Sequence, residues 1–298
     1  MKILVTGKSG QLGSRLARAL APLGSVTALG RDGMDLADPD AIRTVVDDVA
    51  PDIIFNAAAY TAVDDAETDR ATAWRINADA PGEIGKAAAR TGARVVHFST
   101  DYVFDGTLDR PYRETDDVNP INVYGESKRA GEATLLASGA NAWIFRISWV
   151  YAETGRNFLN TIMRLAKERT ELNIVADQTG APTPAGHIAD AMAALTPKLI
   201  TGDTPQGDGT PPIYHLACGG EASWYDFACA IVDRMQRSGC AMAVESIAPV
   251  GSDAYPTAAA RPRNSRLDSG RCAARFAIAL PAWQTALDDT MDRIEQNG

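Results

Sequence analysis

The sequence predicts an α/β fold of Rossmann type, with a doubly wound parallel sheet and a smaller C-terminal lobe. Short apolar runs alternate with longer amphipathic stretches through the first half of the 298-residue chain. A glycine-rich turn follows the first run, and the alternation loosens after about Tyr151. Because strands joined by crossover helices alternate in this way, residues 1–150 are expected to form the sheet domain and residues 151–298 mainly the second lobe.

Five apolar runs are expected to be buried parallel strands. They are residues 3–6, 26–29, 53–55, 95–98 and 144–147. Their continuous apolar character indicates strands that are covered on both faces. Later segments near 173–176 and 213–217 are expected to complete this sheet.

The second lobe combines helical patterns with turn-rich stretches. Helices are expected within residues 157–169, 224–235 and 283–294, and turns within 201–212 and 248–264. The stretch 201–212 is rich in Gly, Pro, Thr and Asp, and an exposed surface loop is preferred over a linker.

Composition excludes several classes of protein. The 29 basic and 38 acidic residues give a formal charge of −9, so no nucleic-acid partner is expected. No apolar stretch is long enough for a membrane span, and no signal peptide is recognised at the N-terminus. Four well-separated cysteines without a paired spacing favour a reducing cytoplasm over a disulfide scaffold or a zinc site.

Residues 7–13 form a Gly-x-x-Gly-x-x-Gly array between the first expected strand and an expected helix. Glycine lets a turn approach a pyrophosphate closely, and the following helix offers free N–H groups and its positive end. A dinucleotide site is therefore expected here, with an incidental tight turn as the alternative. The glycine spacing resembles that of extended short-chain dehydrogenases.

The end of the second expected strand bears on the choice of cofactor. Gly30 stands where a carboxylate would bind a ribose 2′-hydroxyl, and Arg31 follows it. Arg31 could bind a 2′-phosphate or be a surface residue in a turn, so NADPH is preferred over NADH and use of both stays open. Asp35 and Leu36 resemble the adenine-binding pair of the superfamily, although Asp35 could instead cap the next helix.

Tyr124 and Lys128 form a Tyr-x-x-x-Lys motif behind a helix start expected at Asn119–Pro120. At this spacing the two side chains share a helix face, where the ammonium would favour the phenolate and lower the tyrosine pKa. A half-exposed helix face is the alternative. At the end of the fourth expected strand, Thr100 could hold a reacting carbonyl while tyrosine transfers the proton, with Ser99 as the alternative hydroxyl.

Several phrases together resemble the dTDP-4-dehydrorhamnose reductases, a family of that superfamily, over nearly the whole chain. The phrases lie at residues 7–13, 56–64, 99–104, 124–128, 146–151, 177–183 and 261–267. The resemblance implies NAD(P)H-dependent reduction of the C4 ketone of dTDP-4-dehydro-L-rhamnose to dTDP-L-rhamnose, with Tyr124 as general acid. A dTDP-linked 4-keto-6-deoxy sugar is thus the implied substrate.

The resemblance also implies a set of site residues. Catalysis would use Thr100, Tyr124 and Lys128. Cofactor contacts would come from Gly7, Gly10, Gln11, Leu12, Gly13, Arg31, Asp35, Leu36, Ala57, Ala58, Ala59, Tyr60, Thr61, Tyr124 and Lys128. Substrate contacts would come from Thr100, Asp101, Tyr102, Trp149 and Arg261. A core aromatic stays the alternative for Trp149, and a solvated surface charge for Arg261.

Other features carry no sharp function. The acidic run at residues 64–67 is expected to be solvated or to start a helix, and no catalytic metal is expected. Some relatives have glutamates where this chain has Arg15 and Gly186, which argues against a metal-bridged dimer, while a homodimer stays open. The alternatives to a reductase are an epimerase or dehydratase of the same superfamily and a non-catalytic regulatory subunit.

Overall fold

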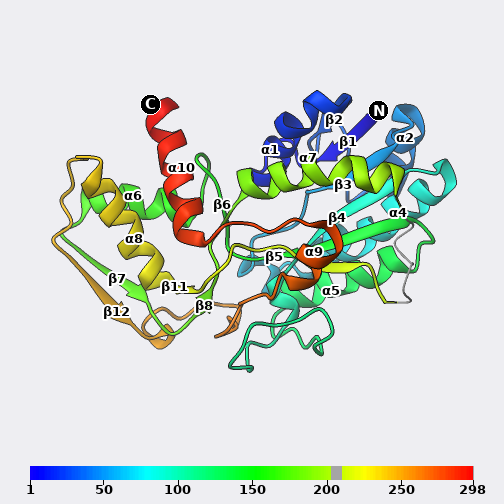
Figure 1. Cartoon of the computed structure of the whole chain (residues 1–298). Helices are drawn as coiled ribbons and strands as arrows, with labels where there is room; N and C mark the ends of the chain where they lie inside the picture. The colour runs from blue at the N-terminus through cyan, green and yellow to red at the C-terminus, as the bar shows by residue number, and fades with distance from the viewer. Residues whose placement is uncertain (203–209, 298) are drawn as a thin grey trace.

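The computed structural model describes residues 1–202 and 210–297 and has an α/β architecture with a central sheet of six strands (Figure 1). Neighbouring strands are parallel, in the order β10-β5-β4-β3-β1-β2. The strands are β1 (Lys2–Thr6), β2 (Ser25–Leu29), β3 (Ile53–Asn56), β4 (Arg94–Thr100), β5 (Asn141–Ile147) and β10 (Ile213–His215). The five strands expected in the first half of the chain and the Rossmann-type sheet are confirmed.

Helices cover both faces of the sheet, because successive strand residues point to opposite sides. Val5, Phe55 and Phe145 pack in one core with α1 (Gln11–Leu20) and α7 (Ala185–Thr201). Their sequence neighbours Leu4, Ile54 and Ile144 pack in a second core. That core is covered by α2 (Pro39–Val49), α4 (Ala80–Thr91) and α5 (Val123–Leu136).

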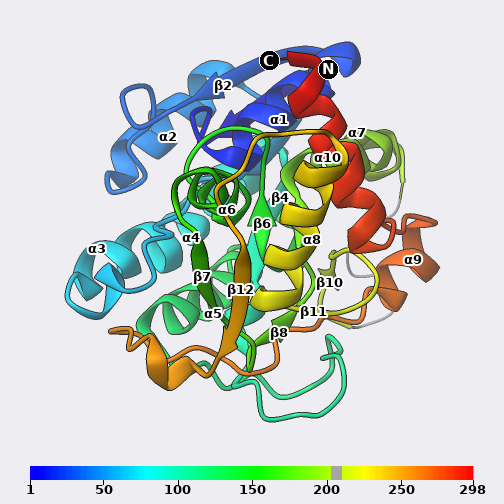
Figure 2. The ribbon, with the colours of Figure 1, turned by 90° about the vertical axis from the view of Figure 1, so that its left-hand side faces the viewer.

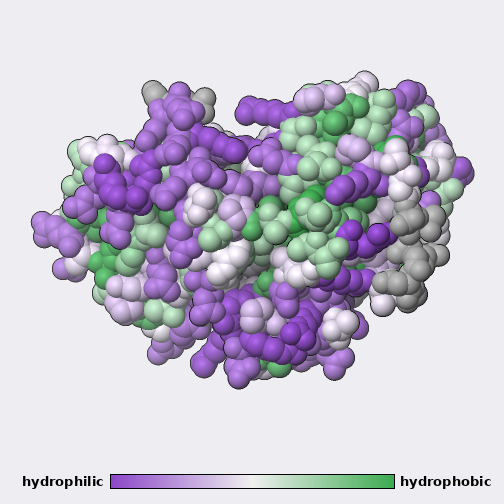
Figure 3. All heavy atoms as spheres, viewed as in Figure 1, coloured by the Kyte–Doolittle hydropathy of each residue, from purple (hydrophilic) through white to green (hydrophobic). Residues whose placement is uncertain are grey.

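The smaller lobe is built around three helices and faces the viewer in Figure 2. The helices are α6 (Phe158–Glu168), α8 (Trp224–Arg237) and α10 (Trp283–Asn297). They share one apolar core, while the face of α10 visible in Figure 3 is mostly hydrophilic. Two segments beyond residue 151, α7 and β10, nevertheless pack with the sheet, so the chain returns to the first domain after leaving it.

The prediction that residues 173–176 complete the central sheet is wrong. β7 (Glu171–Val175) instead pairs in parallel with β12 (Ser246–Val250) in the smaller lobe. Leu172 and Ile174 are buried, whereas Glu171 and Asn173 are exposed. This alternation belongs to a strand covered on one face, and a central strand is covered on both.

The remaining elements are short. They are α3 (Arg70–Trp74), α9 (Gly270–Phe276), β6 (Val150–Tyr151), β8 (Thr179–Gly180), β9 (Thr183–Pro184), β11 (Ala222–Ser223), the π-helical turn η3 (Arg75–Asp79), and the 3₁₀ turns η1 (Ala21–Leu23), η2 (Asp65–Glu67), η4 (Asp101–Val103) and η5 (Ser252–Ala254). Of the loop expected at 201–212, residues 203–209 lie outside the described residues. Among the described helices, none combines the length and apolar character that crossing a membrane requires.

Candidate active site

The site lies at the carboxyl ends of β1, β3 and β4. In the sheet, β2 lies on one side of β1 and β3 on the other, so the chain reverses its winding direction between β1 and β3. Ligands of open α/β sheets bind in the crevice beside such a reversal. The motifs at residues 7–13, 56–59 and 99–104 all follow strands at this edge.

The glycines after β1 are required by close backbone contacts. Gly7 has a φ of +75°, and a Cβ atom there would lie 3.1 Å from the backbone nitrogen of Ala58. A Cβ atom on Gly13 would collide with the Gly7 carbonyl oxygen. Gly10 precedes α1 and leaves the first N–H groups of that helix uncovered by a side chain. This cradle fits a dinucleotide pyrophosphate, since the helix start supplies both N–H donors and partial positive charge.

The loop after β3 is held in place from a neighbouring helix. The Tyr60 N–H donates to Asn77 Oδ1 (2.9 Å), and Asn77 Nδ2 donates to the Tyr60 carbonyl (3.0 Å) and to Ser127 Oγ (3.1 Å). Asn77 is buried and fixes residues 57–61 beside the glycine loop, with Thr61 exposed. Sequence reasoning missed Asn77, and its only signal was a polar residue in an otherwise helical stretch.

Lys8 packs against the end of β2, which Arg31 follows in the sequence. The Lys8 N–H donates to the Leu29 carbonyl (3.1 Å), and a Cβ atom on Gly30 would lie 3.3 Å from Lys8 Cε. Lys8 and Arg31 are both exposed. The sequence pointed only to Arg31, yet the fold adds Lys8 to the same strand end, where a 2′-phosphate would lie.

Asp35 and Leu36 have separate local roles. Asp35 Oδ1 accepts from the Ala37 N–H (2.9 Å), whereas α2 is capped by Asp38, whose carboxylate accepts from the Asp40 N–H (2.9 Å). Asp35 therefore does not cap the helix, the alternative weighed from the sequence. The Leu36 side chain is buried in the core beneath α2.

Helix α5 presents Tyr124 and Lys128 to the crevice. The helix begins at Val123. The prediction that it starts at Asn119–Pro120 is therefore wrong. Asn122 Oδ1 accepts from the Gly125 N–H (2.8 Å), and Glu67 Oε1 accepts from the Val123 N–H (2.9 Å). These two caps fix the first turn, while Asn119 donates to a carboxylate in the preceding loop.

Burial decides the electrostatics of the tyrosine and lysine pair. Lys128 is buried, its ammonium donates to the Phe98 carbonyl (2.6 Å), and desolvation lowers its pKa to about 8. Desolvation also raises the pKa of Tyr124 above its ordinary value, against a hydrogen bond with Thr100 that lowers it. The prediction that the ammonium lowers the tyrosine pKa is therefore wrong. The phenol stays protonated at neutral pH, the form that a general acid needs.

A buried polar chain that the sequence analysis missed leads to Lys128. Thr6 Oγ1 donates to Asn56 Oδ1 (2.8 Å), Asn56 Nδ2 lies 3.0 Å from His97 Nδ1, and His97 Nε2 lies 3.4 Å from Lys128 Nζ. Thr6, Asn56 and His97 are register partners on β1, β3 and β4. Desolvation, then the charge of Lys128, lowers the pKa of His97, so the imidazole is neutral. A polar residue in each of three apolar runs was the available signal.

Thr100 connects the tyrosine to a buried carboxyl group. Its hydroxyl donates to Asp101 Oδ1 (2.8 Å), and the Ser148 hydroxyl donates to Asp101 Oδ2 (3.0 Å). Desolvation raises the pKa of Asp101 to about 6, although these hydrogen bonds lower it. Of the two hydroxyls considered from the sequence, that of Thr100 bonds Asp101 and lowers the pKa of Tyr124, while Ser99 is buried in the strand.

A cavity of about 600 Å³ in the smaller lobe reaches toward these residues. Its lining includes Tyr102, Phe158, Ile174, Gln178, Trp224, Thr257 and Arg261. The Tyr102 ring meets the Tyr124 ring edge to face, with centroids 5.7 Å apart. The cavity therefore opens near Tyr124, and its mixed aromatic and polar lining suits a nucleotide-sized ligand.

Arg261 stands at this cavity in contact with the acidic run at residues 64–67. It pairs with Asp64 (Nη2 to Oδ2, 2.7 Å), and its Cζ lies 5.9 Å from the Tyr102 ring centroid. Its other terminal nitrogen, Nη1, is buried without a hydrogen-bond partner in the part of the chain that the structure describes. Asp64 and Glu67 thus make tertiary contacts, and the acidic run also starts the 3₁₀ turn η2, one of the two alternatives expected from the sequence.

Trp149 is half-buried against a second tryptophan. Its ring stacks on Trp224 with parallel planes and centroids 3.5 Å apart, and a Cβ atom on Gly180 would collide with it. Its φ is +46°, a left-handed conformation that is unusual for a bulky residue. Strain of this kind is concentrated at functional sites because the surrounding structure must hold it.

Arg15 and Gly186, the two positions weighed from the sequence for a metal-bridged dimer, both lie beside charged side chains. Arg15 pairs with Glu153 (2.6 Å), and a Cβ atom on Gly186 would lie 2.8 Å from Arg293 Nη1. Within residues 1–202 and 210–297, no group of three or more His, Cys, Asp or Glu side chains is placed to hold a metal ion.

Comparison with known proteins assigns the family. The chain matches the family described as RmlD substrate binding domain over residues 1–296. It is 47% identical over 289 residues to a dTDP-4-dehydrorhamnose reductase of Burkholderia thailandensis, covering 96% of this chain and 97% of that protein. The chain belongs to the dTDP-4-dehydrorhamnose reductase family. The resemblance found from the motifs is confirmed.

Further members of the dTDP-4-dehydrorhamnose reductase family support this assignment. The enzyme of Escherichia coli K12 is 43% identical over 298 residues, covering 99% of this chain and 98% of that protein. A reductase structure from Clostridium acetobutylicum has a TM-score of 0.89 and 32% identity, covering 99% of this chain and 100% of that one. A Bacillus anthracis structure in complex with NADP has a TM-score of 0.87 and 33% identity, covering 98% and 100%. The chain is thereby an oxidoreductase of the class that acts on a CH–OH group.

Proposed function

We propose that this protein reduces the C4 ketone of dTDP-4-dehydro-L-rhamnose to give dTDP-L-rhamnose, with NADPH as the preferred reductant. The observation that carries the proposal is the edge-to-face packing of Tyr124 on Tyr102, which lines the cavity of about 600 Å³ in the second lobe, with Lys128 on the same helix. Family membership supplies the substrate class, since the relatives from Burkholderia thailandensis and Escherichia coli are named for this reaction.

The residues that would hold the cofactor follow the crevice. The proposed set is Gly7, Gly10, Gln11, Leu12, Gly13, Arg31, Asp35, Leu36, Ala57, Ala58, Ala59, Tyr60, Thr61, Tyr124 and Lys128. The glycine turn and the start of α1 would hold the pyrophosphate, and Arg31 with Lys8 would bind the 2′-phosphate. When bound, the dihydronicotinamide supplies a hydride to C4.

The chain itself supplies the proton and the orientation of the ketone. Tyr124 donates its phenolic proton to the C4 oxygen as the carbonyl becomes an alcohol, and Thr100 hydrogen-bonds the same oxygen. Lys128 would hold the nicotinamide ribose, and its charge would stabilise the phenolate that Tyr124 becomes after giving up its proton. The hydride forms the new C–H bond at C4 and the proton forms the O–H bond, so each ketone becomes one secondary alcohol.

The substrate would bind across the cavity of the smaller lobe. Asp101 and Tyr102 would line the sugar site, Trp149 would contact the sugar, and Arg261 would pair with the diphosphate through its unpartnered Nη1. The ion pair with Asp64 holds the guanidinium in place for that contact.

Cofactor stoichiometry tests the function. Purified protein is mixed with dTDP-4-dehydro-L-rhamnose and excess NADPH, and absorbance of NADPH is followed together with product by chromatography. One NADPH consumed for each dTDP-L-rhamnose formed is expected. Conversion of the sugar with no net loss of NADPH would instead indicate an epimerase or dehydratase, and no conversion would indicate a non-catalytic subunit.

We propose the cytoplasm as the location. Cys218, Cys229, Cys240 and Cys272 are all free thiols, as a reducing compartment would leave them. Labelling of all four in unfolded protein from cell extract, without prior reduction, is the expected result.

A further inference from the structure

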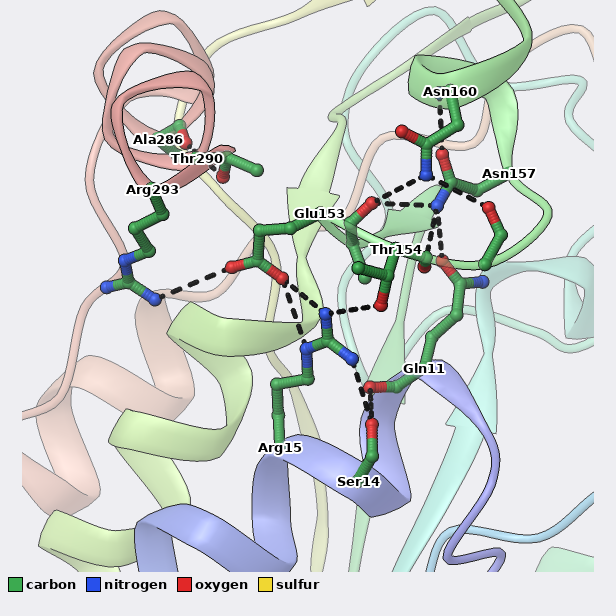
Figure 4. Close-up of polar contacts among 12 residues, drawn as sticks. Gln11, Ser14, Arg15, Glu153, Thr154, Asn157, Asn160, Ala286, Thr290 and Arg293 are labelled. Carbon is green, nitrogen blue, oxygen red and sulfur yellow. Dashed lines mark hydrogen bonds and ion pairs between the residues drawn. The ribbon is translucent and has the colours of Figure 1, made fainter. Parts of the chain in front are cut away.

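A polar cluster joins the start of α1 to the turn at residues 152–157, which leads into α6 (Figure 4). Arg15 donates from Nε (3.1 Å) and Nη2 (2.6 Å) to Glu153 Oε2, and from Nη2 to Thr154 Oγ1 (3.1 Å). The side chains of Arg15 and Glu153 are each only 15% exposed. This ion pair therefore connects the sheet domain with the entry to the smaller lobe.

A second contact in the cluster involves the glycine loop directly. Asn157 Nδ2 donates to Gln11 Oε1 (3.0 Å) and to the Ala152 carbonyl (2.8 Å). Asn157 Oδ1 accepts from the Asn160 N–H (2.9 Å), so the same side chain caps α6. Gln11 is the first residue of α1, next to Gly10. One side chain thus bonds the cofactor cradle and the start of α6.

Helix α6 forms a wall of the cavity proposed for the sugar nucleotide. Phe158, Thr161, Ile162 and Leu165 of this helix line it. None of Gln11, Arg15, Glu153 and Asn157 does. These four residues, the interlobe cluster, therefore lie behind the cavity wall and are placed to act on the ligand only through α6.

Electrostatics keep the cluster intact at neutral pH. Burial would raise the pKa of Glu153, but its backbone hydrogen bond, Arg15 and then Arg293 hold that pKa below its ordinary value. Arg293 Nη1 lies 3.8 Å from Glu153 Oε1, on the side away from Arg15, and comes from α10 (Figure 4). A charged carboxylate between two guanidinium groups fixes the turn from both domains.

We propose that the interlobe cluster is a set of positioning residues that holds α6 against the glycine loop and so sets the affinity for the sugar nucleotide. The proposal rests on the proposed function for the identity of that ligand. Because Gln11 belongs to both the cluster and the cofactor cradle, an occupied cradle and a well-placed α6 stabilise each other. Dinucleotide binding then strengthens nucleotide binding, and the converse follows from linkage.

Two variants remove the Asn157–Gln11 hydrogen bond and the Arg15–Glu153 ion pair one at a time, with little change in local structure. Asn157→Ser keeps a favourable helix cap but is too short to reach Gln11, and Arg15→Gln removes the charge that faces Glu153. The matched control is Arg90→Gln, which removes the exposed ion pair of Arg90 with Asp47, far from the second lobe. Thermal unfolding of each variant verifies that it is folded.

The expected result is a split between binding constants. In both variants KM for the keto sugar rises roughly fivefold, kcat changes less than about twofold, and the Kd of NADPH alone rises by less than about fivefold, because the same linkage acts on the cradle. In the wild type, saturating NADP⁺ tightens dTDP binding by a factor on the order of five, and this factor falls toward one in the variants. The double exchange Arg15→Glu with Glu153→Arg restores part of the dTDP affinity that either single exchange loses.

The outcomes distinguish this proposal from the proposed function. Wild-type turnover with unchanged KM and unchanged NADP⁺ dependence of dTDP binding in both variants would overturn the positioning role alone. If the wild type does not reduce the keto sugar but binds dTDP with a coupling that the variants lose, the function fails and the positioning role stands. No dTDP binding by the wild type would overturn both.

Discussion

Two polar clusters of this molecule differ in how they are built and in how visible they are in the sequence. The proposed catalytic cluster of Thr100, Tyr124 and Lys128 lies where β4 ends and α5 begins, and burial shifts the pKa values of Tyr124 and Lys128 strongly. The interlobe cluster around Arg15 and Glu153 is half-buried and joins segments 138 residues apart, and the pKa of Glu153 is lowered by its backbone hydrogen bond and by Arg15. In the first cluster the proposed reaction requires particular residue types. In the second cluster any residues of suitable length and charge could make the contacts, so the sequence does not reveal them.

The largest effect is expected from removing the proton donor of the catalytic cluster. Tyr124→Phe should lower kcat by about a thousandfold, because general acid catalysis typically contributes factors of about 10² to 10⁴. NADPH affinity should be nearly unchanged, as measured by fluorescence titration. Tyr225→Phe on α8 is the control and should keep full activity; equal activity of Tyr124→Phe and wild type would refute the proposed acid.

The pH dependence of stability should reveal the burial of the catalytic cluster. The pKa of Asp101 is about 6 in the folded chain against 3.8 as its ordinary value, so the native state binds more protons between these values. Stability contributed by this group is full below pH 4 and is lost as pH rises through 6. Relative to wild type, Asp101→Asn should therefore gain up to about 3 kcal/mol between pH 4 and 7.

Urea unfolding at a series of pH values measures this gain. The Asn variant also loses the hydrogen bond that Thr100 or Ser148 makes to the carboxylate, which shifts its stability at every pH by a constant amount. A difference between the two proteins that does not vary with pH would contradict the raised pKa.

Backbone contact within the catalytic cluster gives the next prediction. A Cβ atom on Gly125 would collide with the Tyr102 carbonyl oxygen, whereas one on Gly219 would meet its nearest atoms at 3.9 Å. Gly125→Ala should lower the free energy of unfolding by about 2 kcal/mol and reduce kcat, because α5 must move away from the 3₁₀ turn η4 that contains Tyr102. Gly219→Ala, the matched control, should change stability little; similar losses in both variants would show that close approach at Gly125 is unimportant.

The smallest effect on the free energy of unfolding is expected from the interlobe cluster. Its dependence on pH runs opposite to that of Asp101. Because the pKa of Glu153 is lowered in the folded chain, its contribution is present above its ordinary pKa and is lost as pH falls through the folded value. Glu153→Gln should therefore be less stable than wild type at pH 7 by less than about 1 kcal/mol, with the gap closing in acid. A gap that widens in acid would exclude the ion pair as its source.

Most of the sheet domain could be predicted because its signals are local. Continuous apolar runs, glycines at fixed spacing and the tyrosine-lysine spacing each depend on a few neighbouring residues, and the structure places the strands where those runs lie. The prediction for residues 173–176 failed because a short run with two apolar residues does not show which sheet the strand joins. The exposure of Glu171 and Asn173 shows that β7 is covered on one face only, and this exposure depends on the packing of the smaller lobe.

The sequence by itself determined the family and most of the central sheet, and it pointed to the glycine loop and to Tyr124 and Lys128 as the proposed site. Only the tertiary structure decided that burial raises the tyrosine pKa, that His97 stands behind Lys128, and that Asp64 holds Arg261. The physical reason is distance along the chain. Desolvation and contacts between remote segments exist only after the strands are in register and the two lobes have met.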